Sequence, residues 1–167
     1  GVATYGLEMF RSVPDIDVVF VPIGLGSGFC GIAAAREALS LKTKIIGVVS
    51  AHAPAYALSF QSGRLITQSS STTVAEGVAC SRPNEDALAQ VIRRAADVVT
   101  VTDDEALTAM RELIEGTHNL AEGSGALAFA ALKKQRDQWQ GKRVACILSG
   151  GNASMEVLGR AMSVGSC

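Results

Sequence analysis

The sequence predicts an α/β fold, a three-layer arrangement in which helices cover both faces of a mainly parallel, twisted sheet. Short apolar runs rich in β-branched residues recur along the chain, as is typical of strands buried on both faces. Segments with helical periodicity separate these runs, and such alternation favours parallel strands. With 167 residues, 48% of them hydrophobic, the chain is long enough for one domain with its own core.

The elements of the first half follow in order. Residues 2–11 predict a short helix, and residues 18–22 (VVFVP) predict a fully buried strand. After a glycine-rich turn, residues 29–39 predict a helix and residues 45–49 (IIGVV) a second buried strand. Residues 62–77 are rich in Ser, Thr and Gly, and they predict a loop with little regular structure.

The second half repeats the alternation. Asn84 is placed to cap a helix over residues 85–96, and a strand at 98–101 follows. Residues 102–105 (TDDE) form a capping box, whose Thr hydroxyl and Glu carboxylate satisfy two backbone amides where a helix begins that runs to about Glu115. The remaining predicted elements are a helix over 124–136, a strand over 143–148, a turn at 149–152 and a closing helix over 154–163.

Charge and composition argue against several classes of function. The formal net charge is −1 and no like charges form a block, so we expect neither nucleic acid nor a membrane as a partner. The four cysteines contain no CxxC pair, which argues against zinc, and Cys30 and Cys146 lie in apolar segments where a free thiol is usually buried. Free thiols, with no visible signal peptide, predict a cytoplasmic location. The uncharged stretch 18–35 contains Pro22 and several glycines, so it predicts a strand, a turn and a helix rather than a membrane span.

A glycine-rich turn joins the first predicted strand to the next helix. It comprises Gly24, Leu25, Gly26, Ser27 and Gly28. Glycines let the backbone approach a ligand closely, and the start of the helix directs free amides and the positive end of its dipole at the turn. The arrangement predicts an anion site that suits a phosphate. A plain tight turn is the alternative that this motif alone leaves open.

The same segment imitates a dinucleotide-binding motif. Residues 26–31 (GSGFCG) satisfy the pattern GxGxxG. A dinucleotide site also needs an acidic residue about 20 positions later, at the end of the next strand, to bind the ribose hydroxyls. The sequence has VSAH at 49–52, so the NAD interpretation loses most of its support.

A second glycine turn, Ser149-Gly150-Gly151-Asn152, follows the last predicted strand. Ligands of open α/β sheets collect at the carboxyl ends of the strands. We expect both turns at that edge, where the first would hold an anion and the second would offer a hydroxyl to the same ligand.

Four motifs in this order resemble the C-terminal half of the threonine/serine dehydratases, pyridoxal-phosphate (PLP) enzymes with a fold like that of the tryptophan synthase β chain. The similarity covers nearly all of the chain. It implies PLP as the cofactor, and it implies that residues 1–167 form the C-terminal part of a PLP-binding catalytic domain. The motifs are the turn at 24–28, TVAEG at 73–77, EGSGA at 122–126 and SGGN at 149–152.

The resemblance implies that the amides of residues 24–28 hold the PLP phosphate. Leu25 and Ser27 stand where the family has glycine, and the Ser27 hydroxyl offers an additional donor. Ser149, followed by Gly150, matches the serine that hydrogen-bonds the pyridine nitrogen. A serine hydroxyl is too weak an acid to keep the pyridine protonated, so the ring is a milder electron sink, which suits β-elimination.

Two further segments match residues around the cofactor. Glu122 matches the glutamate of a Glu-Pro-x-Gly-Ala motif near the ring, with Gly123 in place of the proline, and Glu76 and Gly77 match an acidic-Gly pair that flanks the active site. For both carboxylates, stabilisation of a helix start is the alternative.

Some relatives bind a divalent cation through acidic residues after the second strand. Residues 49–55 contain no carboxylate here, so we predict no metal site.

PLP enzymes need a lysine that binds the cofactor covalently. Each lysine of this chain precedes a predicted strand or ends a helix, so we expect all of them at the amino edge of the sheet, about 17–20 Å from the glycine turns. The resemblance places the family's lysine, in a Ser-x-Lys-x-Arg motif, in an N-terminal half upstream. We therefore expect no catalytic residue in this chain, and we interpret it as a fragment that is inactive alone. The lysines are Lys42, Lys44, Lys133, Lys134 and Lys142.

These predictions point to a PLP-dependent ammonia-lyase that removes water and then ammonia from a hydroxy-amino acid, leaving a 2-oxo acid. Threonine, serine and 3-hydroxyaspartate are all open as the small-molecule substrate, and the resemblance implies a homo-oligomer for the full-length protein. Two alternatives stay open. One is a non-catalytic module that binds a phosphate-bearing ligand or a nucleotide, and the other is a structural remnant that pairs with a separately encoded N-terminal half.

Overall fold

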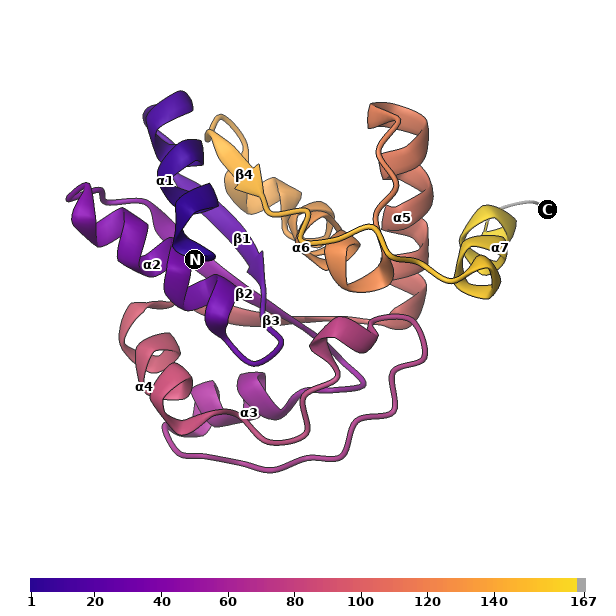
Figure 1. Cartoon of the computed structure of the whole chain (residues 1–167), viewed down its shortest axis with the longest axis horizontal. Helices are drawn as coiled ribbons and strands as arrows, with labels where there is room; N and C mark the ends of the chain where they lie inside the picture. The colour runs from indigo at the N-terminus through magenta and orange to yellow at the C-terminus, as the bar shows by residue number, and fades with distance from the viewer. Residues whose placement is uncertain (165–167) are drawn as a thin grey trace.

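A four-stranded parallel sheet forms the centre of the computed structural model, which describes residues 1–164. The spatial order is β3-β2-β1-β4, and every pairing is parallel. Val19 of β1 lies opposite Ile45 of β2 and Ala145 of β4. The strands are β1 (Val18–Pro22), β2 (Lys44–Ser50), β3 (Asp97–Val101) and β4 (Val144–Cys146), shown in Figure 1.

Helices cover both faces of this sheet (Figure 1), so the predicted three-layer α/β fold is confirmed. One face is covered by α1 (Ala3–Ser12), α2 (Ser27–Ala38), α3 (Ala55–Ser62) and α4 (Glu85–Arg94). The other is covered by α5 (Asp103–Thr117) and α6 (Gly123–Lys134), and α7 (Met155–Ser163) packs against α5. Two short 3-10 turns, η1 (Glu76–Val78) and η2 (Arg136–Trp139), complete the elements.

The central strand β1 divides the hydrophobic core into two. Val19 and Val21 pack with the α1 to α4 layer, whereas Val18 and Phe20 pack with the α5 to α7 layer. All five residues of β1 are buried, as the continuous apolar run predicts. The strand therefore fixes where the turn at residues 24–28 leaves the sheet.

Both predicted helix caps are confirmed. The Asn84 side chain accepts a hydrogen bond of 3.0 Å from the Ala87 amide at the start of α4. At the start of α5, the Thr102 hydroxyl accepts from the Glu105 amide at 3.2 Å, and the Glu105 carboxylate accepts from the Thr102 amide at 2.8 Å. Each bond satisfies an amide that has no partner inside its helix.

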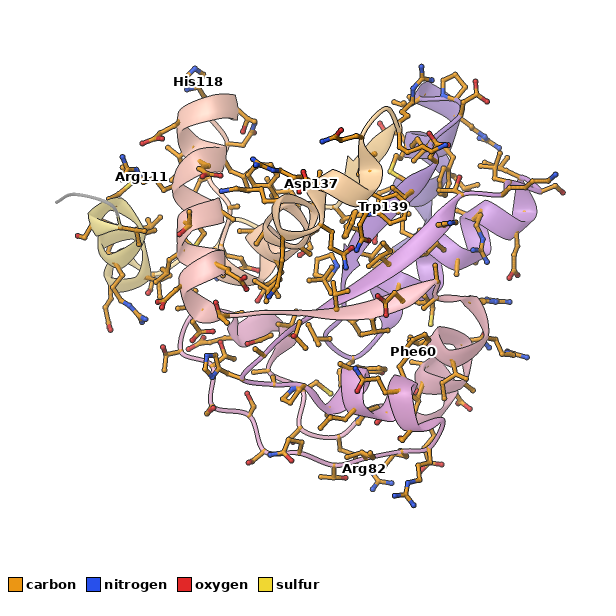
Figure 2. All side chains as sticks on the ribbon, turned by 180° about the vertical axis from the view of Figure 1, so that it is seen from behind. Phe60, Arg82, Arg111, His118, Asp137 and Trp139 are labelled. Atoms are coloured by element: carbon orange, nitrogen blue, oxygen red, sulfur yellow. The ribbon has the colours of Figure 1, made fainter. Side chains whose placement is uncertain are left out.

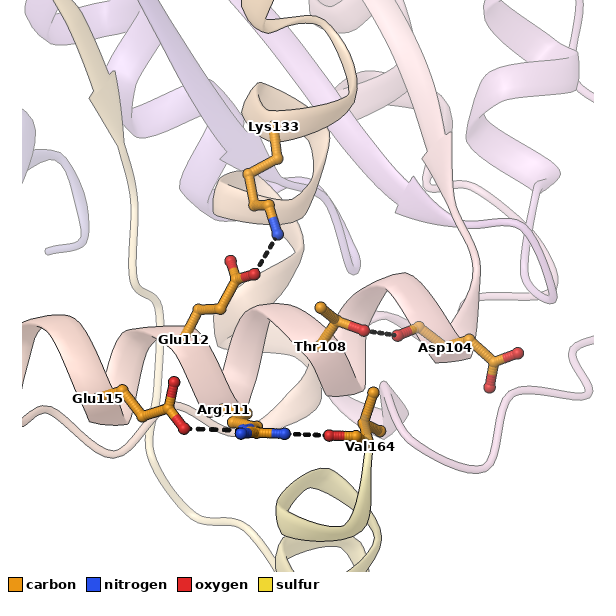
Figure 3. A network of polar contacts seen from close by, with 7 residues as sticks. All are labelled: Asp104, Thr108, Arg111, Glu112, Glu115, Lys133 and Val164. Atoms are coloured by element: carbon orange, nitrogen blue, oxygen red, sulfur yellow. Dashed lines mark hydrogen bonds and ion pairs between the residues drawn. The ribbon is translucent and has the colours of Figure 1, made fainter. Parts of the chain in front are cut away.

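Polar contacts attach the outer helices to the body of the domain (Figure 3). Lys133 of α6 pairs with Glu112 of α5 at 2.5 Å. The Arg111 guanidinium pairs with Glu115 at 2.7 Å and also donates to the Val164 carbonyl at the end of α7. The contact between Arg111 and Val164 attaches the end of α7 to α5, and the pair Lys133–Glu112 joins α6 to α5.

Several boundaries differ from the prediction. Helix α3 was not predicted, because it is apolar on most sides and lacks the alternation of a surface helix. The helix predicted over 124–136 ends at Lys134, and the strand predicted over 143–148 is limited to Val144–Cys146. Within residues 1–164, β4 pairs with β1 alone, over three residue pairs. No helix in this part of the chain has the length and apolar character needed to cross a bilayer.

Candidate functional site

A cavity of about 760 Å³ lies at the carboxyl ends of β1 and β4. This volume falls within the range of about 300–1,000 Å³ that small-molecule and cofactor sites usually occupy. The first glycine turn and Ser149 of the second turn line it, together with one face of α1, the η1 turn and the start of α6. The sequence-predicted residues that it brings together are Gly24, Leu25, Gly26, Ser27, Gly28, Gly77, Glu122 and Ser149.

Glu76 lines a neighbouring hollow instead of this cavity, and Gly150 does not line the cavity either. The Gly150 carbonyl instead accepts a hydrogen bond of 3.0 Å from the Glu122 amide. A side chain at Gly150 would place its Cβ 2.6 Å from Glu122 Oε1. Gly150 therefore supports the backbone of Glu122 and leaves room for its carboxylate, which also lies close to Gly77.

The first turn presents backbone amides that have no hydrogen-bond acceptor within residues 1–164. Among residues 1–164, none of the amides from Gly24 to Phe29 donates a hydrogen bond, and Cys30 is the first amide to bond within α2, to the Gly26 carbonyl at 2.9 Å. Gly26 has a positive φ of 101°, a conformation that favours glycine. A Cβ on Gly24 would lie 2.5 Å from the Gly77 carbonyl oxygen.

Two tyrosines hold the carbonyls of this turn, and nothing in the local sequence pattern pointed to them. The Tyr56 hydroxyl of α3 donates to the Leu25 carbonyl at 2.9 Å, and the Tyr5 hydroxyl of α1 donates to the Gly28 carbonyl at 3.2 Å. In a trans peptide the N–H points away from the C=O, so fixing the Leu25 carbonyl aims the Gly26 amide in the opposite direction. Burial raises the pKa of Tyr56 to about 12 and raises that of Tyr5, so both hydroxyls keep their protons at neutral pH.

The wall opposite the first turn depends on Asp103, the first residue of α5. Its carboxylate accepts hydrogen bonds from the Thr72 hydroxyl at 2.7 Å and from the Thr73 amide at 3.0 Å. The Thr72 hydroxyl in turn accepts from the Ala75 amide at 3.0 Å. These bonds shape the segment that leads into η1, which contains Gly77.

The second turn contributes Ser149, whose side chain is exposed at the mouth of the cavity. The residues just before it, Cys146, Ile147 and Leu148, line the wall. Burial raises the pKa of the Cys146 thiol to about 12, so this sulfur is a neutral, apolar surface rather than a nucleophile.

The lysines do not line this cavity in the structure of residues 1–164. Lys42, Lys44 and Lys142 line a separate hollow of about 370 Å³ at the amino ends of the strands. There the Lys44 ammonium lies 5.7 Å from the centre of the ring of Trp139, a residue labelled in Figure 2. Lys134 is an exception to the predicted placement. Its ammonium lies 3.0 Å from Glu105, which follows the carboxyl end of β3. The amino-edge prediction is therefore wrong for Lys134, because α6 passes alongside the outer strand β3 and the long side chain reaches along it.

No metal-binding cluster occurs in the described part of the chain, where no three His, Cys, Asp or Glu side chains gather. Of the cysteines, Cys30, Cys80 and Cys146 are free and half-buried, and Cys167 lies outside the described residues. The polar groups that line the cavity are therefore unbonded backbone amides, hydroxyls and the Glu122 carboxylate.

An α/β domain that directs unbonded amides at a cavity on the carboxyl edge of its sheet belongs to the class that binds phosphorylated ligands. The comparisons narrow the class. The family model of pyridoxal-phosphate dependent enzymes matches residues 1–150, and the chain belongs to this family.

Relatives within the family are similar over almost the whole chain. The L-threonine ammonia-lyase of Thermotoga maritima is 32% identical over 99% of this chain, and the catabolic L-threonine dehydratase TdcB of Escherichia coli K12 is 38% identical over 93%. The structure of threonine deaminase isoform 2 from Solanum lycopersicum superposes with a TM-score of 0.91 at 29% identity and covers all of this chain. This chain spans 41%, 48% and 49% of the three proteins, respectively, less than half the length of each.

Proposed function

We propose that this chain forms the phosphate- and ring-binding side of a PLP-dependent ammonia-lyase that acts on threonine or serine. The overall reaction removes water by β-elimination and then ammonia, and leaves a 2-oxo acid. The observation that carries the proposal is that the first glycine turn and Ser149 of the second, far apart in sequence, line one cavity in a chain of the PLP-dependent family. The names of the similar proteins support the choice of reaction.

The residues present fit the phosphate of PLP. Six successive amides, from Gly24 to Phe29, have no partner among the described residues, and they lie where the helix dipole of α2 favours negative charge. The close approach of Gly24 to the Gly77 carbonyl leaves no space for a side chain, so the backbone itself forms this wall. The Ser27 hydroxyl, at the first position of α2, is an additional donor.

Ser149 is the proposed partner of the pyridine nitrogen. When bound, PLP supplies an electron sink for the carbon that loses its proton. Ser149 can donate a hydrogen bond to the ring nitrogen or accept one from it, but it does not hold a full charge there. Glu122, with its amide fixed on Gly150, and Gly77 are proposed to flank the ring and limit its orientation.

The lysine of the reaction must come from another polypeptide segment, because the cavity contains no lysine among residues 1–164. We infer that the chain acts as the C-terminal part of a PLP-binding catalytic domain. A homo-oligomeric assembly and a cytoplasmic location belong to the same proposal, and they rest on the resemblance and on the free cysteines. Which hydroxy-amino acid is preferred depends on groups that would contact the substrate from outside this chain.

The test is an assay of 2-oxo acid formation from threonine and serine, with PLP added. We expect no turnover by the chain alone, and turnover after it is mixed with a separately expressed N-terminal half of a related threonine ammonia-lyase. Ser149→Ala in the mixed enzyme should reduce the rate without preventing assembly. Covalent attachment of PLP to the chain alone, abolished by replacing one of its lysines, would contradict the proposal that the catalytic lysine comes from outside this chain.

A further inference from the structure

Tyr5 brings a phenolic hydroxyl to the phosphate end of the cavity from a helix outside both glycine turns. It is half-buried and lines the cavity together with Val2, the N-cap residue three positions before it, and Met9, four positions after it on α1. Residues at this spacing share one face of a helix, so α1 directs that face at the cavity.

The position of Tyr5 is fixed by close packing between α1 and α2. A Cβ on Gly31 of α2 would lie 3.1 Å from the Ala3 amide nitrogen, and a Cβ on Gly6 of α1 would lie 3.1 Å from the Ala35 Cβ. Glycines at both positions let the two helices approach closely. The backbone at Tyr5 is therefore held close to the first turn of α2.

The present hydrogen bond of the Tyr5 hydroxyl is weak and easily exchanged. Its oxygen lies 3.2 Å from the Gly28 carbonyl, longer than the usual distance of about 2.7–2.8 Å for an O–H···O bond. Gly28 lies inside α2, so its carbonyl can also accept from the main-chain amide four residues later. The hydroxyl can turn to another acceptor without leaving that carbonyl unsatisfied.

We propose that Tyr5 is a further phosphate-binding residue, whose hydroxyl turns from the Gly28 carbonyl to an oxygen of the phosphate held by the amides of residues 24–29. The proposal rests on the function proposed above, since it needs a phosphate at that turn. A hydrogen bond to an anionic oxygen is shorter and roughly twice as strong as one to a neutral carbonyl. Because burial raises the pKa of Tyr5, the proton needed for donation is present throughout the neutral range.

The geometry explains why a hydroxyl is useful here. Leu25, in the middle of the turn, is 70% exposed and directs no polar group at the cavity. Amides of one turn approach a tetrahedral phosphate from one side, whereas Tyr5 approaches from the α1 side. The two together would enclose the anion more completely than the turn does alone.

The experiment is a titration with inorganic phosphate followed by ¹⁵N NMR of the backbone amides, for the wild-type chain and Tyr5→Phe. The expected result is a set of shifts at residues 24–29, with a Kd for phosphate about tenfold weaker in Tyr5→Phe, as the loss of one hydrogen bond to a charged group predicts. Thr4→Val is the control, because the exposed Thr4 hydroxyl bonds the Gly1 carbonyl away from the cavity and its loss should leave the Kd unchanged.

The outcomes separate the two proposals. Phosphate binding at residues 24–29 with equal Kd in wild type and Tyr5→Phe overturns the role of Tyr5 and leaves the proposed function standing. No phosphate-dependent shift at those amides in the wild type overturns the phosphate site, and the inference with it. If Tyr5→Phe does not fold, ¹³Cζ-labelled tyrosine in the wild type gives the answer. Phosphate should shift the Tyr5 signal more than that of Tyr56, and an unchanged Tyr5 signal at saturation refutes the inference.

Discussion

The two edges of the parallel sheet use their backbone polar groups in opposite ways. At the amino edge, Asp17 joins three strands. Its amide donates to the Arg143 carbonyl at 2.9 Å, its carbonyl accepts from the Lys44 amide at 2.9 Å, and its carboxylate accepts from the Arg143 amide at 2.8 Å. At the carboxyl edge, the amides from Gly24 to Phe29 have no acceptor among the described residues. One edge is closed by its own hydrogen bonds, and the other is open to a ligand.

This difference shows that positive side chains are a poor guide to the anion site in this fold. Three lysines line the hollow at the amino edge of the sheet. Two of them already have partners, since Lys142 is paired with Asp17 at 3.6 Å and Lys44 lies over the ring of Trp139. The carboxyl-edge cavity has no cationic side chain in its lining within residues 1–164. Its attraction for an anion comes from unbonded amides and a helix dipole, which are neutral groups.

The largest effect is expected from Gly24→Ala. The new Cβ would meet the Gly77 carbonyl oxygen at 2.5 Å, so the turn or its opposite wall must shift. We expect the free energy of unfolding to fall by about 1–3 kcal/mol, as for other overpacked sites, and phosphate binding to be lost. Chemical denaturation measures the first effect and a phosphate titration the second.

Gly116→Ala is the matched control for that variant. Gly116 lies in α5, and a Cβ there would meet nothing within 4 Å. The helix should gain up to about 1 kcal/mol of stability from alanine, with phosphate affinity unchanged. Equal loss of phosphate binding in both variants would contradict the role assigned to the first turn.

Tyr56→Phe should produce a smaller effect at the same edge. The variant keeps the ring, which is 1% exposed, but removes the hydrogen bond to the Leu25 carbonyl. We expect a loss of about 1 kcal/mol in unfolding free energy. Phosphate binding should become severalfold weaker, because the Gly26 amide is no longer held in the direction of the cavity. Unchanged affinity with reduced stability would show that Tyr56 supports the fold and not the turn.

At the amino edge, Asp17→Asn should change the dependence of stability on pH. The hydrogen bond from the Arg143 amide, followed by the Lys142 ammonium, lowers the pKa of Asp17. A carboxyl whose pKa is lowered on folding contributes stability above its unfolded pKa and loses it as the pH falls through its folded value. Denaturation measured between neutral and acidic pH should therefore show a shallower decline for Asp17→Asn.

The smallest effect is expected from replacing the lysines one at a time with glutamine. Exposed charges separated by more than a Debye length, about 8 Å at physiological ionic strength, are largely screened from one another. Each variant should alter the Kd for inorganic phosphate by less than about twofold under those conditions. A tenfold loss in Lys42→Gln or Lys44→Gln would move the anion site to the amino edge and reverse the comparison.

Local sequence patterns were sufficient to predict those elements of the fold that are determined by residues close together in the sequence. The buried strands, the Asn84 cap and the Thr102–Glu105 capping box all follow from residues within one or two turns of each other. The glycine turns could also be found, because a strand followed by glycines and a helix start has a local signature. That both turns lie at one edge of the sheet follows from the rule that the carboxyl ends of parallel strands lie at the same edge.

Contacts between distant segments were not predictable in this way. Tyr5 and Tyr56 lie 23 and 31 residues from the carbonyls that they hold, and neither belongs to a motif. Asp103 was recognised only as part of a capping box, although its carboxylate also fixes Thr72 and Thr73. Lys134 was misplaced because the path of α6 along β3 depends on the packing of the whole layer. Helix α3 was not predicted because its buried, mostly apolar residues show no amphipathic periodicity.

The most direct test of the account uses pyridoxine 5′-phosphate, which carries the phosphate and ring of PLP but has no aldehyde to react with lysines. In a ¹⁵N NMR titration, the amides of residues 24–29 and of Ser149 should shift together with a single Kd, whereas unphosphorylated pyridoxine should produce much weaker binding. Shifts confined to the lysine-bearing edge, or different Kd values for the two glycine turns, would contradict the claim that these turns bind one phosphorylated pyridine ring.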